Sequence, residues 1–310
     1  MLSGSADGGQ KRPKRTLEQD FINIQKVSGM KDQPLAPKTA ARLAAEDDSN
    51  SLSGVIPKLA HLLEHTKDLE VAYLCDQNAV QVSKLWGSEG QWCGYRNIQM
   101  LCLALQSALS PSAPLRQKLK GGKPTVPELQ AMIEGAWDQG INPHGRTQLG
   151  GVMGTTKYIG TSEAEALLLS LAIPCTGRKF DGNQAWSEVI DSVEEYYSAA
   201  MPSIAKRKDN AGRVHITSRP SIFLQRPGHS VTVVGITRLE SGKRYLLIFD
   251  PAWSAPASFR KDDLFTCEEC KGLSARWVLR QYMKSESWLS KWKTFETLSV
   301  DLPSREACWR

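Results

Sequence analysis

Three residues of this chain have the types and the order needed for nucleophilic catalysis by a thiol. Cys93 stands in GQWCGYRNIQMLCLALQ, where a glycine-containing loop meets an apolar helical pattern. The spacing of Ile98, Leu101 and Leu105 predicts a helix that begins near Cys93. The free N–H groups and the dipole of a helix N-terminus favour a thiolate, which is the nucleophilic form of cysteine.

The second half of the chain supplies a base and a residue to orient it. His229 directly precedes a β-type run in RPGHSVTVVGI, and Asp250 ends the next such run in RYLLIFDPAW. The intervening LESGKR predicts a hairpin whose turn lies near Ser241 and Gly242. We expect the hairpin to set His229 beside Asp250, with the carboxylate accepting the Nδ1–H of the imidazole and leaving Nε2 free. Together with Cys93 they form a papain-like constellation.

Each of the three residues also has a purely structural interpretation. An isolated cysteine is commonly a core thiol, as we expect for Cys102. A histidine at the start of a strand is commonly a polar edge residue, and Asp-Pro after a strand is commonly a turn. From the residue pattern alone, both interpretations stay open.

The composition is that of an ordinary globular protein, with 310 residues of which 41% are hydrophobic. No apolar run approaches the length of a membrane span, and no signal-like segment stands at the N-terminus. Because the seven cysteines are an odd number, we expect free thiols in a reducing compartment. The formal net charge of +6 permits an acidic partner but does not require nucleic acid. We therefore expect neither a membrane nor a nucleic acid as the main partner.

The chain changes character near residue 50. Residues 1–50 are rich in Ser, Gly, Asp, Lys and Pro, and this composition predicts a disordered basic tail. Its KRPKR cluster is either a nuclear import signal or a solvated run of charge. Residues 51–310 predict one α+β domain, in which a helical N-terminal half packs on a mainly antiparallel sheet. We expect the protein in the cytoplasm and the nucleus.

Helices can be placed from apolar spacing and from capping signals. A stripe predicts a helix within residues 52–63. Thr125 and Glu128 form a capping box that starts a second helix. A third helix is expected after YIGTSEAEALLLSL, residues 158–171, and a fourth carries the apolar stripe of residues 186–197.

Four motifs resemble the peptidase domain of the zinc-finger-containing ubiquitin peptidase family (ZUFSP) and of the related peptidases specific for the ubiquitin-fold modifier. They are WCGYRNIQML, YIGTSEAEALL, IFLQRPGHSVTVVGI and LLIFDPAW, and the resemblance covers about residues 55–298. It implies a papain-like fold without a cofactor, with Cys93 as nucleophile, His229 as general base and Asp250 as its orienter. It also implies a deubiquitinating cysteine peptidase that cleaves isopeptide bonds in ubiquitin chains and prefers lysine-sixty-three linkages.

Three features depart from the family pattern. Trp92 directly precedes Cys93, where the animal proteins read Trp-Gly-Cys. The animal ZUFSP carries several zinc fingers, whereas Cys267 and Cys270 form a single C-x-x-C with no matched second pair nearby, so we expect no metal site. Ala252 follows the Asp-Pro pair, where modifier-specific peptidases typically show Asp-Pro-His. This last departure favours the ubiquitin-directed branch.

Further site residues are assigned by position. Gln91 is the candidate side-chain donor to the oxyanion, and it is otherwise an ordinary loop residue. Trp92, Tyr95 and Trp253 are candidates to line a narrow cleft for the Gly-Gly tail of ubiquitin, or else are core aromatics. The helix within residues 51–66 either offers an apolar surface to ubiquitin or is buried in the domain.

Two other classes of function stay open at this point. A modifier-specific peptidase, or another Cys-His-Asp acyl-transfer enzyme, shares the same chemistry and differs in its substrate. A non-catalytic ubiquitin-binding protein keeps the fold, but it has no need of all three residues. The expected partners are ubiquitin and polyubiquitin chains.

Overall fold

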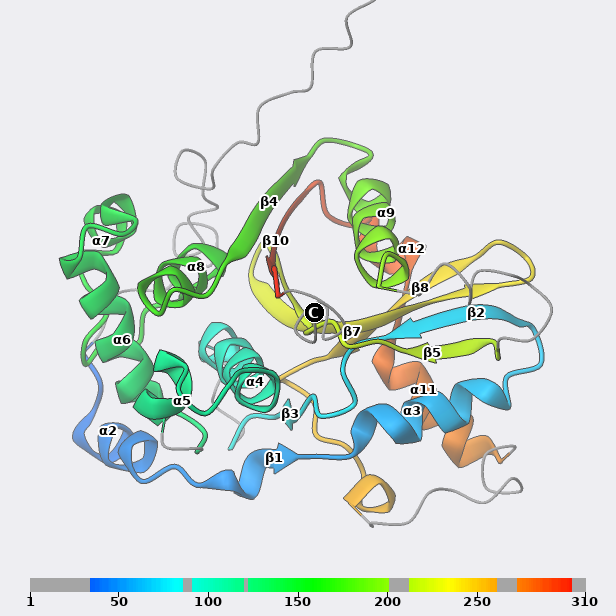
Figure 1. Ribbon diagram of the computed structural model, residues 1–310, viewed down its shortest axis with the longest axis horizontal. Helices are drawn as coiled ribbons and strands as arrows, with labels where there is room; N and C mark the ends of the chain where they lie inside the picture. The colour runs from blue at the N-terminus through cyan, green and yellow to red at the C-terminus, as the bar shows by residue number, and fades with distance from the viewer. Residues whose placement is uncertain (1–33, 86–90, 120–121, 201–211, 261–271, 303–310) are drawn as a thin grey trace, which may run out of the picture.

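The computed structural model describes residues 34–85, 91–119, 122–200, 212–260 and 272–302, and Figure 1 shows helices packed around a curved sheet. This is the α+β class that the sequence predicted. The predictions for residues 1–33, including the basic cluster, and for Cys267 and Cys270 lie outside the described residues. None of the helices in the described ranges is long and apolar enough to cross a membrane.

The described chain contains an eight-stranded sheet with the order β4-β10-β6-β7-β2-β5, and β8 pairs with both β7 and β9. The strand pairs are antiparallel except β2 with β5, so the sheet is mainly antiparallel as predicted. Its strands are β2 (Leu69–Leu74), β4 (Cys175–Asp181), β5 (Val214–Ile216), β6 (Ile222–Arg226), β7 (His229–Leu239), β8 (Arg244–Phe249), β9 (Met283–Ser285) and β10 (Thr294–Val300). A separate two-stranded sheet pairs β1 (Ser51–Leu52) with β3 (Gln81–Val82).

The helices form two groups with α4 between them (Figure 1). One group packs with α4 around an apolar cluster that reaches β6 and β10, and it includes α2, α6 and α8. The other packs on the centre of the sheet and includes α3, α9 and α11. The bounds are α2 (Pro37–Ala44), α3 (Val55–Glu64), α4 (Cys93–Ala108), α5 (Pro114–Leu119), α6 (Val126–Asp138), α7 (Pro143–Leu149), α8 (Thr161–Ser170), α9 (Ala185–Ser198), α11 (Leu273–Tyr282) and α12 (Glu286–Leu289), with short 3-10 turns η2 (Asp48–Asn50) and η3 (Ala257–Arg260).

Three predicted helices are confirmed by α3, α6 and α9. The capping box of α6 is present, because the Glu128 carboxylate accepts from the Thr125 N–H at 2.7 Å and the Glu128 N–H donates to the Thr125 hydroxyl. The third prediction was wrong, since α8 lies within the YIGTSEAEALLLSL motif rather than after it. The missed signal is Glu163, whose carboxylate accepts from the Gly160 N–H at 2.8 Å and starts the helix inside the motif.

The predicted hairpin is confirmed by β7 and β8, which pair antiparallel with a turn at residues 240–243. Gly242 has φ of 79°, a conformation that favours glycine. Its N–H donates to the carbonyl of Leu239 at 2.8 Å. The hairpin places the first residue of β7 and the residue after β8 at the same open end.

The predicted tail boundary at residue 50 is too late, because residues 34–50 belong to the fold. Helix α2 buries Leu43 completely in the same apolar cluster as α4 and α6. The segment is polar overall, so its composition did not indicate that Leu43 is buried in the core or that Glu46 forms a buried ion pair, which is described below. Strand β2 is a second departure, since it lies in the half for which we predicted helices and pairs with β7 at the centre of the sheet.

Candidate active site

Cys93 is the first residue of α4, and its side chain lies in a buried position with 7% of the residue exposed. Gly94 explains how the helix can start there. A Cβ at Gly94 would lie 2.3 Å from the carbonyl oxygen of Ile159, so only glycine lets the first turn of α4 approach that segment. The close approach holds the first turn of α4 against the segment that precedes α8.

His229 and Asp250 lie at the open end of the hairpin, as the sequence predicted. The Nε2–H of His229 donates to Oδ1 of Asp250 at 2.8 Å. The same oxygen accepts the backbone N–H of Ala252 at 2.9 Å. The predicted ring nitrogen was wrong, because strand geometry turns Nε2 rather than Nδ1 toward the carboxylate. Nδ1 is therefore the ring nitrogen that remains for Cys93.

The thiol of Cys93 and the imidazole of His229 form a hydrogen-bonded pair with shifted pKa values. Burial raises the pKa of Cys93, but hydrogen bonds to His229 and Ser230 and the charge of the imidazolium outweigh it, and the net shift is downward. Burial lowers the pKa of His229, but its bonds to Asp250 and Cys93 raise it to about 9. Both shifts favour a thiolate beside an imidazolium, the charge distribution of a reactive cysteine.

Asp250 completes the charge pattern. Burial raises the pKa of its carboxyl, but the hydrogen bond from His229, the imidazolium charge and the Ala252 N–H hold it below the ordinary value. The carboxylate therefore stays ionised and keeps the imidazole in one orientation.

Asn97 fastens the cysteine-bearing helix to the histidine-bearing strand. Its side chain, which is fully buried, donates to the hydroxyl of Ser230 and accepts from the hydroxyl of Thr232, both at 2.8 Å. Ser230 in turn hydrogen bonds to the Cys93 sulfur through its hydroxyl and its backbone. The sequence motifs contained Asn97 and Ser230 beside the predicted site residues, but their spacing gave no sign that they meet.

Arg226 is a second residue that the sequence analysis missed. It pairs with His229 across β6 and β7, and its guanidinium carbon lies 4.0 Å from the ring centroid of Trp292 and 5.6 Å from that of Trp288. The charges of Asp250 and Cys93 attract this guanidinium. The two tryptophans come from the C-terminal part of the chain, so no local motif links them to the site.

The predicted cleft-lining role of two residues was wrong. Trp92 is 1% exposed and Tyr95 is fully buried, and both pack in the apolar cluster between α4, α6 and α8. Their rings contact each other at a centroid distance of 5.6 Å, and the Tyr95 hydroxyl accepts from Gln130 at 3.3 Å. Both point to the inner side of α4, away from solvent, so they support the helix rather than line a cleft.

The remaining two candidates are close to triad residues in sequence. Gln91 is partly exposed in the turn before α4, and its side chain makes no hydrogen bond with another described residue. Trp253 is partly exposed three residues after Asp250, and its ring contacts Tyr282 edge-on at 4.9 Å. The helix α3, by contrast, buries Val55, Leu59 and the rest of its apolar stripe in the core, so the alternative of a buried helix is the one that the structure supports.

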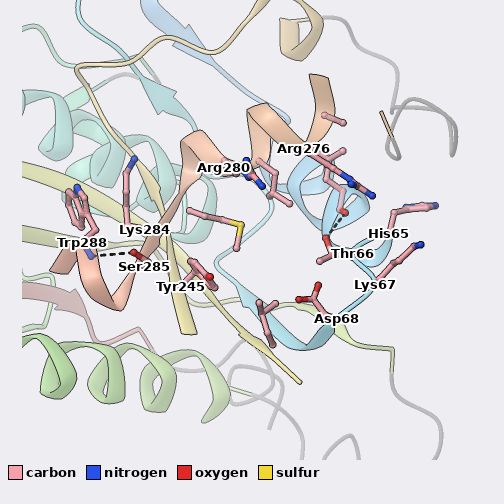
Figure 2. A pocket seen from close by; sticks show the side chains of 15 residues that line it. His65, Thr66, Lys67, Asp68, Tyr245, Arg276, Arg280, Lys284, Ser285 and Trp288 are labelled. Atoms are coloured by element: carbon pink, nitrogen blue, oxygen red, sulfur yellow. Dashed lines mark hydrogen bonds between the residues drawn. The ribbon is translucent and has the colours of Figure 1, made fainter. Parts of the chain in front are cut away.

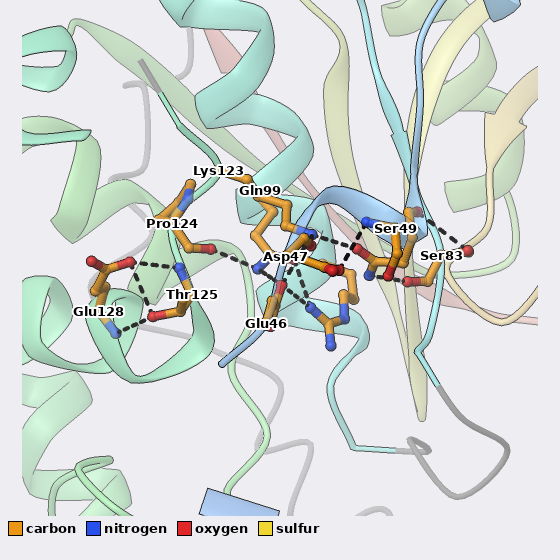
Figure 3. Close-up of polar contacts among 11 residues, drawn as sticks. Glu46, Asp47, Ser49, Ser83, Gln99, Lys123, Pro124, Thr125 and Glu128 are labelled. Atoms are coloured by element: carbon orange, nitrogen blue, oxygen red, sulfur yellow. Dashed lines mark hydrogen bonds and ion pairs between the residues drawn. The ribbon is translucent and has the colours of Figure 1, made fainter. Parts of the chain in front are cut away.

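The opposite side of α4 is held by a buried ion pair with the N-terminal segment (Figure 3). The fully buried carboxylate of Glu46 accepts from Arg96 at 2.6 Å and from Gln99 at 2.5 Å, and Lys123 lies 3.3 Å away. Arg96 follows Cys93 by three residues. The segment before residue 50 therefore positions the helix that carries the thiol.

The described residues contain no group of three or more His, Cys, Asp and Glu side chains arranged to hold a metal ion. The C-x-x-C pair of Cys267 and Cys270 lies outside the described residues.

Comparison with known proteins identifies relatives that match part of this chain. The chain is 37% identical over 172 residues to zinc finger-containing ubiquitin peptidase 1 of Rattus norvegicus, covering 54% of this chain and 28% of that protein. It is 26% identical over 201 residues to ubiquitin carboxyl-terminal hydrolase mug105 of Schizosaccharomyces pombe, covering 64% of this chain and 75% of that protein.

A solved structure of UfSP from C. elegans aligns with 79% of this chain and 37% of its own, at 15% identity and a TM-score of 0.44. The chain spans about a third of the length of the zinc finger-containing ubiquitin peptidases that it matches. The sequence model of Peptidase family C78 matches residues 69–295, a span that includes Cys93, His229 and Asp250. The chain is therefore a member of Peptidase family C78.

Proposed function

We propose that this protein is a cysteine peptidase that hydrolyses isopeptide bonds in ubiquitin chains. The observation that carries the proposal is the Cys93 thiol at the start of α4, its pKa lowered in contact with His229, whose Nε2–H donates to Asp250. A protein that only bound ubiquitin has no need of a thiol with a lowered pKa. Cys93 acts as nucleophile, His229 as general acid and base, and Asp250 as the residue that orients the imidazole.

The reaction follows from the positions of these groups. The Cys93 thiolate attacks the carbonyl carbon of the isopeptide bond, and the carbonyl π electrons move to the oxygen. As the oxyanion collapses, the C–N bond breaks, and the imidazolium of His229 gives its proton to the departing lysine amine. Water then gives a proton to His229 and attacks the thioester carbonyl. The C–S bond breaks, Cys93 leaves as the thiolate beside the imidazolium, and the acid product loses its remaining proton to solvent to become a carboxylate.

The oxyanion of the tetrahedral intermediate needs N–H donors. The backbone N–H of Cys93 stands at the helix N-terminus, where the free amide groups and the dipole stabilise negative charge. Gln91 stands two residues before it in the preceding turn and is our candidate for the side-chain donor. Trp253 is our candidate for a cleft wall beside the substrate tail.

The substrate class is argued from relatives and from one motif. Two of the relatives are named as a ubiquitin peptidase and a ubiquitin carboxyl-terminal hydrolase. The residues after the second strand of the hairpin read Asp-Pro-Ala rather than the Asp-Pro-His that is typical of modifier-specific peptidases. We propose ubiquitin as the modifier, lysine-sixty-three-linked chains as the preferred polymer, and the cytoplasm and nucleus as the location.

The decisive experiment is covalent labelling by a ubiquitin probe with a C-terminal alkyne, beside the equivalent probe of the ubiquitin-fold modifier. We expect the ubiquitin probe to label the wild type and not Cys93→Ala. Labelling by the modifier probe alone contradicts the choice of substrate but not the mechanism. Absence of labelling by both contradicts the peptidase itself. A panel of the eight ubiquitin linkage types then tests the linkage preference. Equal cleavage of all linkages contradicts that preference.

A further inference from the structure

A groove separate from the catalytic triad lies between α3, β8, β9 and α11 (Figure 2). Its volume is about 630 Å³, within the range of pockets that bind ligands. The apolar part of its lining is made by seven residues of these elements and their neighbours: Leu62, Leu239, Tyr245, Ala275, Leu279, Met283 and Trp288. The groove can therefore accept apolar side chains.

The same groove has a strongly basic rim. Lys67, Arg276 and Arg280 are exposed, Lys284 is half-buried, and Asp68 is the one carboxylate among the described residues that line the groove. Figure 2 shows Arg276 and Arg280 along the α11 side and Asp68 across from them. The rim thus carries an excess of positive charge around an apolar floor.

Three of these cations differ from the arginines on the neighbouring strands in the part of the chain that the structure describes. Within the described chain, the charged ends of Lys67, Arg276 and Arg280 make no ion pair and no side-chain hydrogen bond. Arg238 on β7, by contrast, bonds to Glu70 at 2.9 Å, and Arg244 on β8 bonds to Asp191 at 2.5 Å. Charges that a fold neutralises are paired within the molecule, whereas unpaired ones around a groove are free to recognise a ligand.

Helix α11 adds an exposed aromatic residue next to this rim. Trp277 is 54% exposed and precedes Arg280 by three residues, so the two side chains are neighbours on the helix surface. Tryptophan and arginine are the residue types that most often dominate the energy of protein–protein contacts. The composition of the exposed side of α11 therefore matches that of an interaction surface.

We propose that this groove binds an acidic peptide segment of a partner protein, one in which carboxylates alternate with large apolar side chains. Its Asp and Glu side chains pair with Arg276, Arg280 and Lys67, and its apolar side chains lie against Leu279 and Met283. The groove is lined by Leu239 and Tyr245, at the turn end of the β7–β8 hairpin, so a bound segment lies away from the triad at the open end. The binding does not depend on the peptidase activity.

The test is fluorescence anisotropy with the full chain and a labelled twelve-residue peptide that repeats Glu-Leu-Glu-Phe. We expect saturable binding that the double variant Arg276→Glu/Arg280→Glu weakens at least tenfold. The matched control is Lys38→Glu/Lys118→Glu, which changes the net charge equally on α2 and α5, at the far end of the molecule (Figure 1). We expect the control to bind like the wild type. Circular dichroism verifies that both variants are folded.

Several outcomes overturn the proposal. One is the absence of saturable binding, and another is equal weakening by the control, which means that net charge alone attracts the peptide. Tighter binding to phosphatidylserine vesicles than to the peptide, lost in Arg276→Glu/Arg280→Glu, assigns the groove to a membrane surface. Self-association that this variant abolishes, measured by sedimentation velocity, assigns it to a second copy of the chain.

Discussion

Cys93 and Cys102 lie on the same helix and both are buried, yet the pKa values of their thiols are shifted in opposite directions. Burial raises the pKa of Cys102 to about 12, with no polar partner to offset it. Cys93 is buried too, but His229 and Ser230 hydrogen bond to its sulfur and lower its pKa. Position on the helix decides the difference, because Cys93 lies at the end of α4 that meets His229 and Ser230, whereas Cys102 lies farther along the helix in the apolar cluster. A buried thiol becomes reactive when donors and a cation meet it, and burial alone makes it inert.

The largest effect is expected from removing the reactive thiol. Cys93→Ala should lower the cleavage rate by about 10⁶-fold, as loss of a nucleophile does in other triads. Its fold should persist, because a small side chain at a helix start leaves little packing behind. Rates on di-ubiquitin, with circular dichroism, measure both.

Cys102→Ala is the matched control on the same helix. We expect it to keep a rate within a few-fold of the wild type and to lose some stability from the small cavity in the core. Activity that survives in Cys93→Ala and disappears in Cys102→Ala would show that the wrong thiol was chosen.

The second largest effect is expected at the carboxylate. Asp250→Asn should lower the rate by roughly 10² to 10⁴-fold, because the amide no longer fixes the imidazole or stabilises its charge. His229→Ala should be inactive. Single-turnover rates measure the chemical step, and a loss confined to KM would contradict an orienting role for Asp250.

The pH dependence of alkylation sharpens the comparison between the two thiols. Cys93 should react with iodoacetamide with a midpoint below the ordinary thiol pKa of about 8.5, and its rate should fall as the pH drops through that midpoint, because the thiolate is the reacting form. Cys102 should stay unreactive up to high pH. His229→Ala should move the Cys93 midpoint upward, since it removes the imidazolium. Mass spectrometry of each labelled peptide follows the reaction, and an unchanged midpoint in His229→Ala contradicts the pairing.

The same groups predict a pH window for stability. The pKa of His229 rises to about 9 in the folded state, so its contribution is complete below about 6.5 and is lost as the pH rises through about 9. The pKa of Asp250 is lowered, so its contribution is present above about 4 and is lost as the pH falls further. The free energies of unfolding of wild type and His229→Ala, measured with urea, should differ most between about pH 4 and pH 6.5. A constant difference from pH 5 to 10 contradicts the assignment.

The smallest effect on catalysis is expected on the other side of α4. Glu46→Gln breaks a buried ion pair and should lower the free energy of unfolding by about 3–5 kcal/mol, because it removes the buried carboxylate that Arg96 and Lys123 face. The cleavage rate per folded molecule should change by less than tenfold. Asp47→Asn, an exposed neighbour, is the control and should change stability little. Equal losses in the two variants would contradict the importance of the buried pair.

Local chemistry in the sequence determined the elements that position the triad. The capping box before α6, the stripes of α3 and α9, and the hairpin signals around Gly242 each depend on neighbours in the chain, and each was predicted. His229 and Asp250 could be placed side by side because antiparallel strands joined by a short turn must align their open ends. The order of the three residues, with the family motifs around them, then led to the site.

Only the tertiary structure decided what meets these elements from far along the chain. Trp92 and Tyr95 look like cleft residues beside a cysteine, but the packing of α6 and α8 buries them. The choice of Nε2 over Nδ1 is set by side-chain orientation within the hairpin. The bonds from Asn97 to β7 and the attachment of Glu46 to Arg96 join segments 50 or more residues apart. Apolar spacing specifies which face of a helix is buried, but not which partner covers it, because burial is non-directional whereas hydrogen bonds and ion pairs require the final geometry.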